Sequence, residues 1–234
     1  MKIGVLGDVH NNIQAFEAIL ERFLEEKAEL ILCTGDLVGI GPSPEEVVSL
    51  AMCVPNFRCV RGNHENALFK TPEGLSEPEL AHLKWKLGKL SKASLSYLSG
   101  LPMEYEMNCE GFKIKLLHYP FDGNKFRKVN ENSESDEFRQ LFSDVRGDIV
   151  LFGHGHHRAV SVKDGRYLLN FGSCGCPHED RGIARGGIVE IKNGSVSFKD
   201  VCAEYDLSAV ISEIDKLKYA DFAYIKRVFY GQNI

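Results

Sequence analysis

Several short apolar runs of this sequence end in residues whose side chains could bind a metal ion. The run "KIGVL" leads to Asp8 and His10, and four later runs lead to Asp36, to Asn63 and His64, to His118, and to His154 and His156. Imidazole nitrogens and carboxylate oxygens together suit Mn²⁺, Fe or Zn²⁺, whereas Ca²⁺ prefers oxygen ligands alone. This many ligands exceed the need of one ion, so we expect two ions about 3.5 to 4 Å apart that share a carboxylate.

The spacing within these groups also favours a common centre. Asp8 and His10, like His154 and His156, are two residues apart, and alternate residues of an extended segment share a face. A glycine precedes several of the groups, as expected where the backbone must turn sharply and approach an ion closely. Taken singly, an aspartate after a strand usually caps a turn or a helix, and "HGHH" could be a surface patch. Recurrence at five strand ends favours the metal site, whereas His157, His82 and His178 are assigned no metal role.

The elements that must position these residues follow from hydrophobic periodicity. Runs at 2–6, 30–33 and 57–60 alternate with helical patterns, which predicts parallel strands joined by right-handed crossovers. Ligands bind at the carboxyl ends of such strands, because the loops converge there. Further strand signals lie at 112–117, 148–152, 167–171, 186–191 and 195–201. We expect one domain over 1–234, with a helical insertion at about 67–102 and a C-terminal helical segment at about 207–230 that packs or dimerises.

Composition restricts the class of protein. A chain of 234 residues with 44% hydrophobic residues fits one globular domain, and a formal net charge of -5 makes a nucleic-acid partner unexpected. The beginning of the chain lacks a signal-peptide pattern and no apolar run is long enough to cross a bilayer, so we expect a cytoplasmic protein without a membrane partner. Seven scattered cysteines do not resemble a disulfide framework, and Cys174 and Cys176 lack the second pair of a structural zinc site.

The motifs resemble those of a known family. The blocks "GDVHNN", "GDLVGIGP", "GNHE", the isolated His118 and "GHGHH" are similar to the signature of the calcineurin-like metallophosphoesterases, and "NFGSCGCPHEDRG" resembles a segment of their small bacterial and archaeal phosphodiesterase branch. The resemblance implies a four-layer α/β/β/α sandwich with a dinuclear metal site at the strand ends, Mn²⁺ being favoured over Fe and Zn²⁺. By this pattern Asp36 bridges the ions and His64 is the catalytic histidine; one ion is held by Asp8, His10 and His156, the other by Asn63, His118 and His154.

Two departures from the family pattern bear on the substrate. Protein phosphatases of the family have an arginine directly after the second block, but "GDLVGIGP" has none, so protein phosphatase activity is not expected. His178 stands where the branch often has arginine, and Arg181 or Arg185 could take over its contact with the substrate. Asn63, His64 and Arg181 are therefore the predicted substrate-binding residues.

These features predict a metal-dependent phosphoesterase in which a metal-bridging hydroxide attacks a phosphate ester, with His64 as the general acid. A phosphodiester in a small phosphate-ester or nucleotide substrate is favoured. A phosphomonoesterase or a dinucleoside polyphosphate hydrolase with the same site remains an alternative, as does a non-catalytic binding scaffold of the same fold, like a retromer subunit. A homodimer also remains open.

Overall fold

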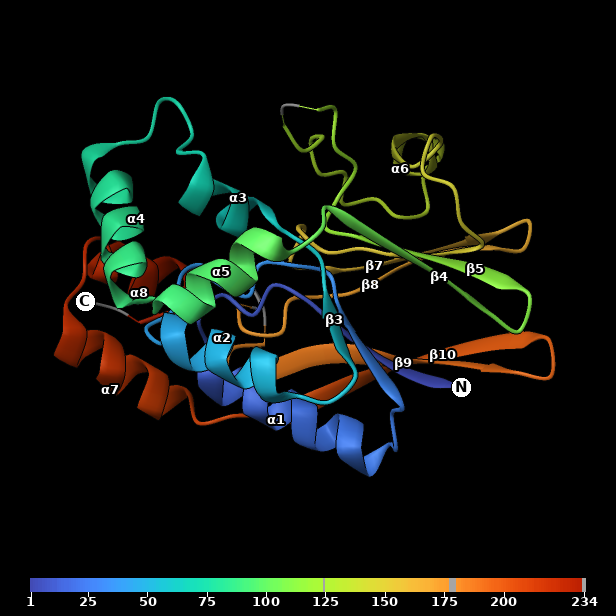
Figure 1. Cartoon of the computed structure of the whole chain (residues 1–234), viewed down its shortest axis with the longest axis horizontal. Helices are drawn as coiled ribbons and strands as arrows, with labels where there is room; N and C mark the ends of the chain where they lie inside the picture. Colours follow the sequence, from blue (N-terminus) through green and yellow to red (C-terminus); the bar gives the residue numbers. More distant parts are fainter. Residues whose placement is uncertain (124, 177–179, 233–234) are drawn as a thin grey trace.

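The fold consists of two five-stranded sheets that pack face to face, with helices outside them (Figure 1). The structure is a computed structural model that describes residues 1–123, 125–176 and 180–232. The strand orders are β10-β9-β1-β2-β3 in the first sheet and β4-β5-β6-β8-β7 in the second. The sandwich of two sheets flanked by helices confirms the predicted fold class.

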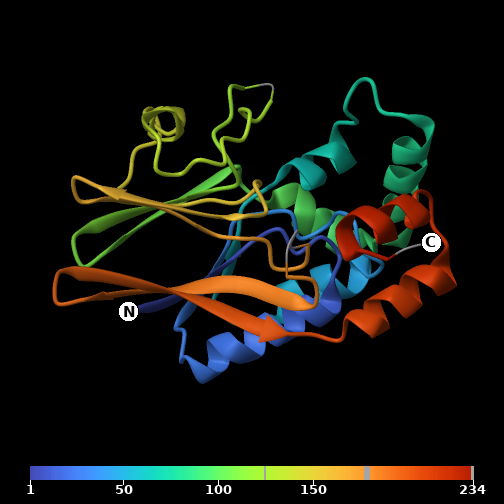
Figure 2. The same cartoon turned by 180° about the vertical axis from the view of Figure 1, so that it is seen from behind.

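The first sheet contains the predicted parallel unit. Strands β1 (Lys2–Leu6), β2 (Leu30–Cys33) and β3 (Phe57–Cys59) are parallel, and α1 (Ile13–Glu25) and α2 (Pro44–Cys53) connect them. Helix α1 begins where the Asn12 side chain accepts a hydrogen bond from the backbone N–H of Ala15, and it buries its apolar stripe against the sheet. Strands β9 (Ile183–Lys192) and β10 (Ser195–Glu204) complete the sheet, with β9 antiparallel to β1 (Figure 2).

The second sheet adds two strands that the sequence patterns did not indicate. Strands β5 (Phe112–Leu117), β6 (Ile149–Leu151) and β8 (Arg166–Phe171) form its parallel centre. The edges are β4 (Glu104–Cys109) and β7 (Arg158–Lys163), each antiparallel to its neighbour. Both edge strands, "EYEMNC" and "RAVSVK", are half polar and largely exposed, so they lack the continuous apolar runs that marked the central strands.

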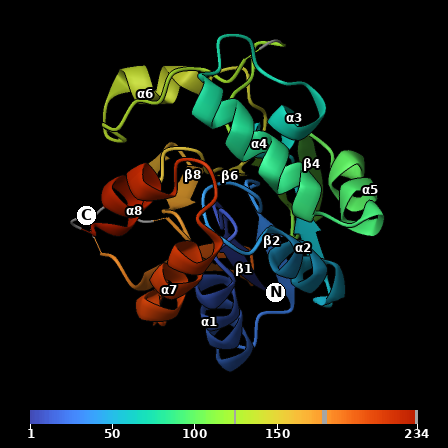
Figure 3. The same cartoon turned by 90° about the vertical axis from the view of Figure 1, so that its left-hand side faces the viewer.

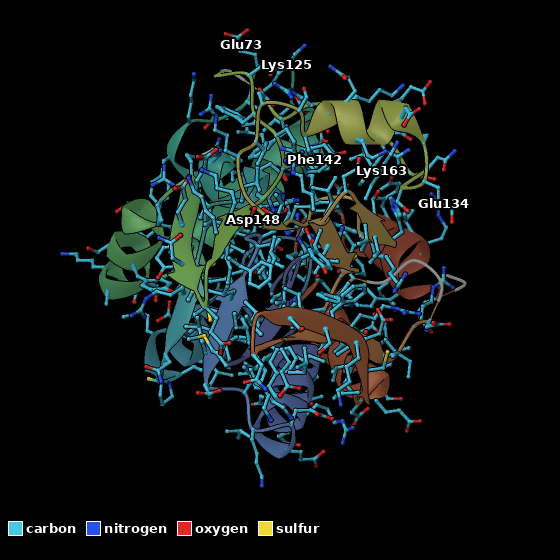
Figure 4. The ribbon with its side chains drawn as sticks, turned by 90° about the vertical axis from the view of Figure 1, so that its right-hand side faces the viewer. Glu73, Lys125, Glu134, Phe142, Asp148 and Lys163 are labelled. Atoms are coloured by element: carbon cyan, nitrogen blue, oxygen red, sulfur yellow. The ribbon has the colours of Figure 1, made fainter. Side chains whose placement is uncertain are left out.

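Three buried clusters hold these layers together. The facing sides of the two sheets bury aliphatic side chains such as Val5, Leu116 and Leu169 between them. Helices α1 and α2 pack on the outer face of the first sheet. On the outer face of the second sheet, α6 (Asp136–Leu141) and Phe142 cover Phe152, while Lys163 and Glu134 lie at the surface (Figure 4). The central strands are therefore packed on both faces, and this packing fixes the positions of the loops at their ends.

The remaining helices gather at one end of the sandwich. Helices α3 (Asn63–Phe69), α4 (Glu77–Lys89) and α5 (Lys92–Gly100) follow β3, and α7 (Leu207–Leu217) and α8 (Phe222–Tyr230) follow β10. Helices α4 and α5 lie in the range of the predicted insertion, but α3 starts earlier, at a predicted ligand. Figure 3 looks onto this end, where α4, α7 and α8 surround the ends of β1, β2 and β6. Among the described residues no helix has the length and apolarity needed to cross a bilayer.

Candidate metal centre

The predicted ligands converge at the carboxyl ends of the central strands in two groups. In the first group, Nε2 of His10 lies 2.8 Å from Nε2 of His156. Oδ1 of Asp8 lies 3.9 Å from Nε2 of His10 and 3.8 Å from Nε2 of His156. The loops after β1 and β6, which are far apart in the sequence, therefore present one carboxylate and two imidazoles to a common point.

The second group combines one amide and two imidazoles. Oδ1 of Asn63 lies 2.9 Å from Nε2 of His118 and 3.0 Å from Nδ1 of His154, and the two ring nitrogens are 3.2 Å apart. The other nitrogen of His118, Nδ1, donates to the backbone carbonyl of Thr34 at 2.8 Å. Once His118 has lost its second proton, that hydrogen bond leaves the lone pair of Nε2 directed at Asn63 and His154, as a metal ligand requires.

Asp36 lies between the two groups. Its Oδ2 is 3.9 Å from Nε2 of His10 and 3.4 Å from Nε2 of His118, so one carboxylate oxygen faces both sets of ligands. Its Oδ1 accepts a hydrogen bond from the backbone N–H of His64 at 2.9 Å, which ties the loop after β2 to the first turn of α3. The position of Asp36 suits the bridging role that the resemblance implied.

The spacing of these atoms fits divalent metal ions. Ligands that bind one ion at about 2.0 to 2.2 Å lie about 3 to 4 Å from each other, depending on the angle between them. The atoms of the second group are 2.9 to 3.2 Å apart, and those of the first group are 2.8 to 3.9 Å apart. Each group brings together atoms that offer lone pairs, an arrangement that is unfavourable until a cation lies between them. Asp8, His10, Asp36 and His118 are also fully or almost fully buried, which keeps water from competing. The ligand set therefore fits a pair of transition-metal ions.

Five of the ligands have a left-handed backbone, which the sequence reasoning did not predict. The φ angles are 52° at Asp8, 52° at His10, 54° at Asp36, 73° at His154 and 60° at His156. The prediction that the D-x-H and H-x-H segments are extended was therefore wrong. The ligand side chains converge because hydrogen bonds between the loops hold the backbone in these turns. The backbone N–H of Asp8 donates to the Gly35 carbonyl, and that of His10 donates to the Asp36 carbonyl, both at 3.0 Å.

The glycines before the ligands permit close approach. A side chain at Gly62 would collide with the carboxylate of Asp36, and one at Gly153 would collide with Asp8 and Thr34. Neither glycine has a positive φ, so the space that a Cβ would fill, rather than the backbone conformation, requires glycine at these two positions.

Comparison with known proteins identifies the family of this chain and structures with the same fold. The sequence profile of the calcineurin-like phosphoesterase superfamily domain matches residues 1–194. The chain belongs to the calcineurin-like phosphoesterase superfamily. It is 26% identical to an uncharacterised protein of Methanocaldococcus jannaschii over 98% of each chain. A metallophosphoesterase of Sphaerobacter thermophilus has the same fold, with a TM-score of 0.75 and 24% identity over 99% of each chain. A hypothetical protein of Pyrococcus horikoshii has a TM-score of 0.81 and 21% identity, covering 100% of this chain and 99% of the other.

Two residues outside the predicted set hold the metallophosphoesterase loops in place. The buried carboxylate of Glu65 accepts hydrogen bonds from the backbone N–H groups of Gly62, Asp36 and Val38 at 2.8, 2.9 and 3.0 Å. It thereby joins the start of α3 to the loop after β2. The Thr34 carbonyl orients His118, as described above. The "GNHE" block contained Glu65, but only the folded loops show which N–H groups it binds.

Burial and neighbouring charges shift the pKa values of the metal-free centre. Burial raises the pKa of Asp8 to about 7. Burial lowers the pKa of His64 to about 4, although Asp36 opposes this shift, so the ring of His64 is neutral at pH 7. For His118 the loss of hydration lowers the pKa, but the charge and hydrogen bond of Asp36, together with the charge of Asp8 and the Thr34 carbonyl, outweigh it and raise the pKa to about 10. Metal binding must therefore displace a proton from His118 at neutral pH.

A pocket of about 400 Å³ opens over the centre. Asp36, Asn63, His64, His154 and His156 form its floor. Two walls come from other elements: α4 contributes Glu79 and His82, and the C-terminal segment contributes Asp221, Tyr224, Ile225 and Phe229. The prediction did not include these wall residues, because nothing in their local sequence relates α8 to the metal ligands.

The other predicted or excluded side chains lie as follows. The Arg181 guanidinium lies against Gly231 just beyond α8 and is absent from the described lining of the pocket, so its predicted substrate contact has no support. His82, which was assigned no role, lines the pocket and stacks on Tyr219 at a ring distance of 5.1 Å. The ring of His157 donates to the Gly155 carbonyl. The prediction for His178 lies outside the described residues.

Proposed function

We propose that this protein is a hydrolase that cleaves a phosphodiester in a small, nucleotide-like substrate. Membership of the calcineurin-like phosphoesterase superfamily supports hydrolysis of a phosphate ester. The observation that carries the proposal is the position of Asp36 between two complete groups of ligands. Scaffolds that have lost activity often lose ligands, and the two intact groups therefore favour an enzyme.

The two groups would hold two divalent ions, with Mn²⁺ favoured. Asp8, His10 and His156 would bind one ion, Asn63, His118 and His154 the other, and Asp36 both. When bound, such ions act as Lewis acids on phosphoryl oxygens and lower the pKa of coordinated water toward neutrality. The Asn63 amide would also orient the phosphate.

His64 is the proposed general acid. It lines the pocket beside Asn63, and its ring centroid is 4.8 Å from that of His10, next to the ligands without belonging to either group of three. Its ring is neutral at pH 7 in the substrate-free protein. A bound phosphate anion raises the pKa of a neighbouring imidazole, because negative charge favours the protonated form. His64 would then protonate the leaving oxygen of the substrate.

The pocket walls support a diester. Ile40, Ile225 and Phe229 offer apolar surface, and Tyr224 offers an exposed aromatic ring. These side chains suit an organic group such as a nucleobase on one side of the phosphate. An archaeal phosphodiesterase has the same fold with a TM-score of 0.52 and 18% identity. A phosphomonoesterase that binds its organic group against this wall is the second candidate.

A rate screen of metal-loaded protein tests the proposal. We expect hydrolysis of bis(p-nitrophenyl) phosphate, cyclic nucleotides or dinucleotides to exceed that of p-nitrophenyl phosphate and nucleoside monophosphates. Asp36→Asn is the control for contaminating activity, because it weakens the shared ligand and should abolish turnover. Faster hydrolysis of monoesters would overturn the diester preference, and inactivity on every ester with Mn²⁺ bound would show a scaffold.

A further inference from the structure

Asp221 stands at the start of α8 but does not cap that helix. An aspartate in this position normally accepts a hydrogen bond from a backbone N–H of the first turn, as Asp206 does from Ala209 at the start of α7. At Asp221 the backbone is left-handed, with φ at 64°, and the carboxylate makes no capping hydrogen bond. It also forms no ion pair with any residue of 1–123, 125–176 or 180–232. The described part of the chain therefore leaves the acceptor oxygens of Asp221 unused.

Asp221 borders the pocket over the metal centre. Asp221 and Tyr224 both line this pocket of about 400 Å³, and they are three residues apart, so they are neighbours on one side of α8. Figure 3 shows α8 at the end of the sandwich where the metal ligands converge. A carboxylate and an aromatic ring thus lie together at the space that a substrate of the metal centre would occupy.

Tyr224 supplies a flat surface beside this carboxylate. Its side chain is 53% exposed. The Phe229 ring is nearly perpendicular to the Tyr224 ring at a centroid distance of 6.5 Å, and the Arg227 guanidinium lies over the Tyr224 ring, 5.9 Å from its centroid. Arg227 covers one face of the ring, so a planar group of a substrate would stack on the other.

The charges of the wall restrict what this planar group can be. The described lining contains the carboxylates of Glu79 and Asp221 and no lysine or arginine. One oxygen of Glu79 accepts hydrogen bonds from the backbone N–H and the hydroxyl of Ser76, whereas both oxygens of Asp221 are available. A substrate that covered Asp221 without donating to it would leave a desolvated charge unpaired, which is unfavourable. The wall therefore suits an uncharged planar group with hydrogen-bond donors on its edge.

We propose that Asp221 selects the base of a nucleotide substrate, which stacks on Tyr224 and donates two N–H groups from its edge to the Asp221 carboxylate. Guanine has two N–H groups side by side that match the two carboxylate oxygens, whereas adenine and uracil have a donor next to an acceptor. The inference rests on the proposed function and names its substrate class as guanine nucleotides. The competing explanation is structural: aspartate tolerates the left-handed backbone between α7 and α8 better than most residues do.

Nucleotide binding by variants that keep this backbone separates the two explanations. Asp221→Asn removes the charge and Asp221→Gly removes the side chain, and both residues tolerate a positive φ. Asp164→Asn is the matched control, because Asp164 also has a left-handed backbone, with φ at 51°, at an exposed position after β7. Each protein is loaded with stoichiometric Mn²⁺, freed of excess metal and titrated in a calorimeter. The ligands are guanosine monophosphate, inosine monophosphate, which lacks only the amino group of the base, and inorganic phosphate.

The nucleotide and inorganic phosphate should respond differently. We expect both Asp221 variants to bind guanosine monophosphate about tenfold more weakly or worse than wild type. Inorganic phosphate should bind them as tightly as wild type or more tightly, because a nearby negative charge has been removed. Loss of the amino group should weaken binding to wild type but have little effect in Asp221→Gly, as expected for two groups in contact. Asp164→Asn should bind all three ligands like wild type.

The outcomes distinguish this inference from the proposed function. Equal affinity of wild type and Asp221→Gly for guanosine monophosphate, or no binding of it to wild type, overturns the inference even if diesters are hydrolysed. Equal losses for guanosine and inosine monophosphates, or parallel losses for the nucleotide and inorganic phosphate, overturn it as well. Binding that depends on both Asp221 and the amino group, in a protein that hydrolyses no ester, supports the inference and overturns the proposed function.

Discussion

At the scale of single residues, the types of the ligands were predictable and their conformations were not. Aspartate, asparagine and histidine at strand ends indicated a metal centre from the sequence alone, because those side chains carry lone pairs. The left-handed backbone at Asp8, His10 and Asp36 depends on hydrogen bonds between loops that are distant in sequence. Each such residue costs about 1 to 3 kcal/mol, so the rest of the fold must stabilise the centre.

Replacing His64 by Ala tests the role of this side chain in protonation. We expect the metal content to remain that of wild type, because the side chain of His64 belongs to neither group of ligands. Turnover should fall about 10² to 10⁴-fold, the usual loss when a general acid is removed. Metal analysis and steady-state rates on esters with good and poor leaving groups check this, and the loss should be larger for the poor leaving group. Full activity on the poor leaving group would contradict the role.

At the scale of elements, the central strands followed from apolar runs, whereas the edges did not. Strands β4 and β7 pair on one side only and expose much of their length, so their sequences carry little hydrophobic signal. Helix α3 starts at Asn63, directly after β3, so that two predicted site residues also form its first turn. The contact between the insertion and the C-terminal helical segment could not be predicted from the sequence either, because its aromatic residues are far apart in the chain. Trp85 of α4 stacks on Tyr219 with ring centroids 4.2 Å apart.

Replacing Tyr219 by Phe tests whether this contact holds the pocket wall. The Tyr219 hydroxyl donates to the buried carbonyl of Ile40 at 2.9 Å, and its loss leaves that carbonyl unpaired. We expect the free energy of unfolding to fall by about 1 to 3 kcal/mol and KM to rise, with metal content unchanged. Thermal unfolding and hydrogen exchange of α8 are the measurements. Tyr224→Phe, at an exposed position of the same helix, should change stability little. Equal stability of the two variants would show that the hydroxyl is not needed.

At the scale of the whole molecule, the ligand groups join both sheets. The loops after β1 and β2 belong to the first sheet, and His118, His154 and His156 follow strands of the second. Ions bound between them would link the two layers of the sandwich directly. The overall architecture was predictable from the order of the motifs, but this linkage required the spatial arrangement of the sheets.

Removal of metal should therefore destabilise the protein as a whole. An ion that binds only the folded chain stabilises it by about 2.7 kcal/mol at a concentration one hundred times its Kd. We expect a chelator to lower the melting temperature and stoichiometric Mn²⁺ to restore it, whereas Ca²⁺ should restore it less, because imidazole ligands suit it poorly. Scanning calorimetry with and without chelator measures this. A melting temperature that does not respond to Mn²⁺ would argue against a metal centre in this fold.

The two walls of the pocket come from distant parts of the chain, and this has a consequence for synthesis. The proposed metal ligands lie between Asp8 and His156 and leave the ribosome first, and the wall residues Tyr224, Ile225 and Phe229 leave it after them. Strand β9, which lies beside β1 in the first sheet, emerges between them. A nascent chain thus gains the donors for its ions well before it can enclose a substrate, and translation that stops short of α8 would yield a protein whose catalytic groups are open to solvent on one side.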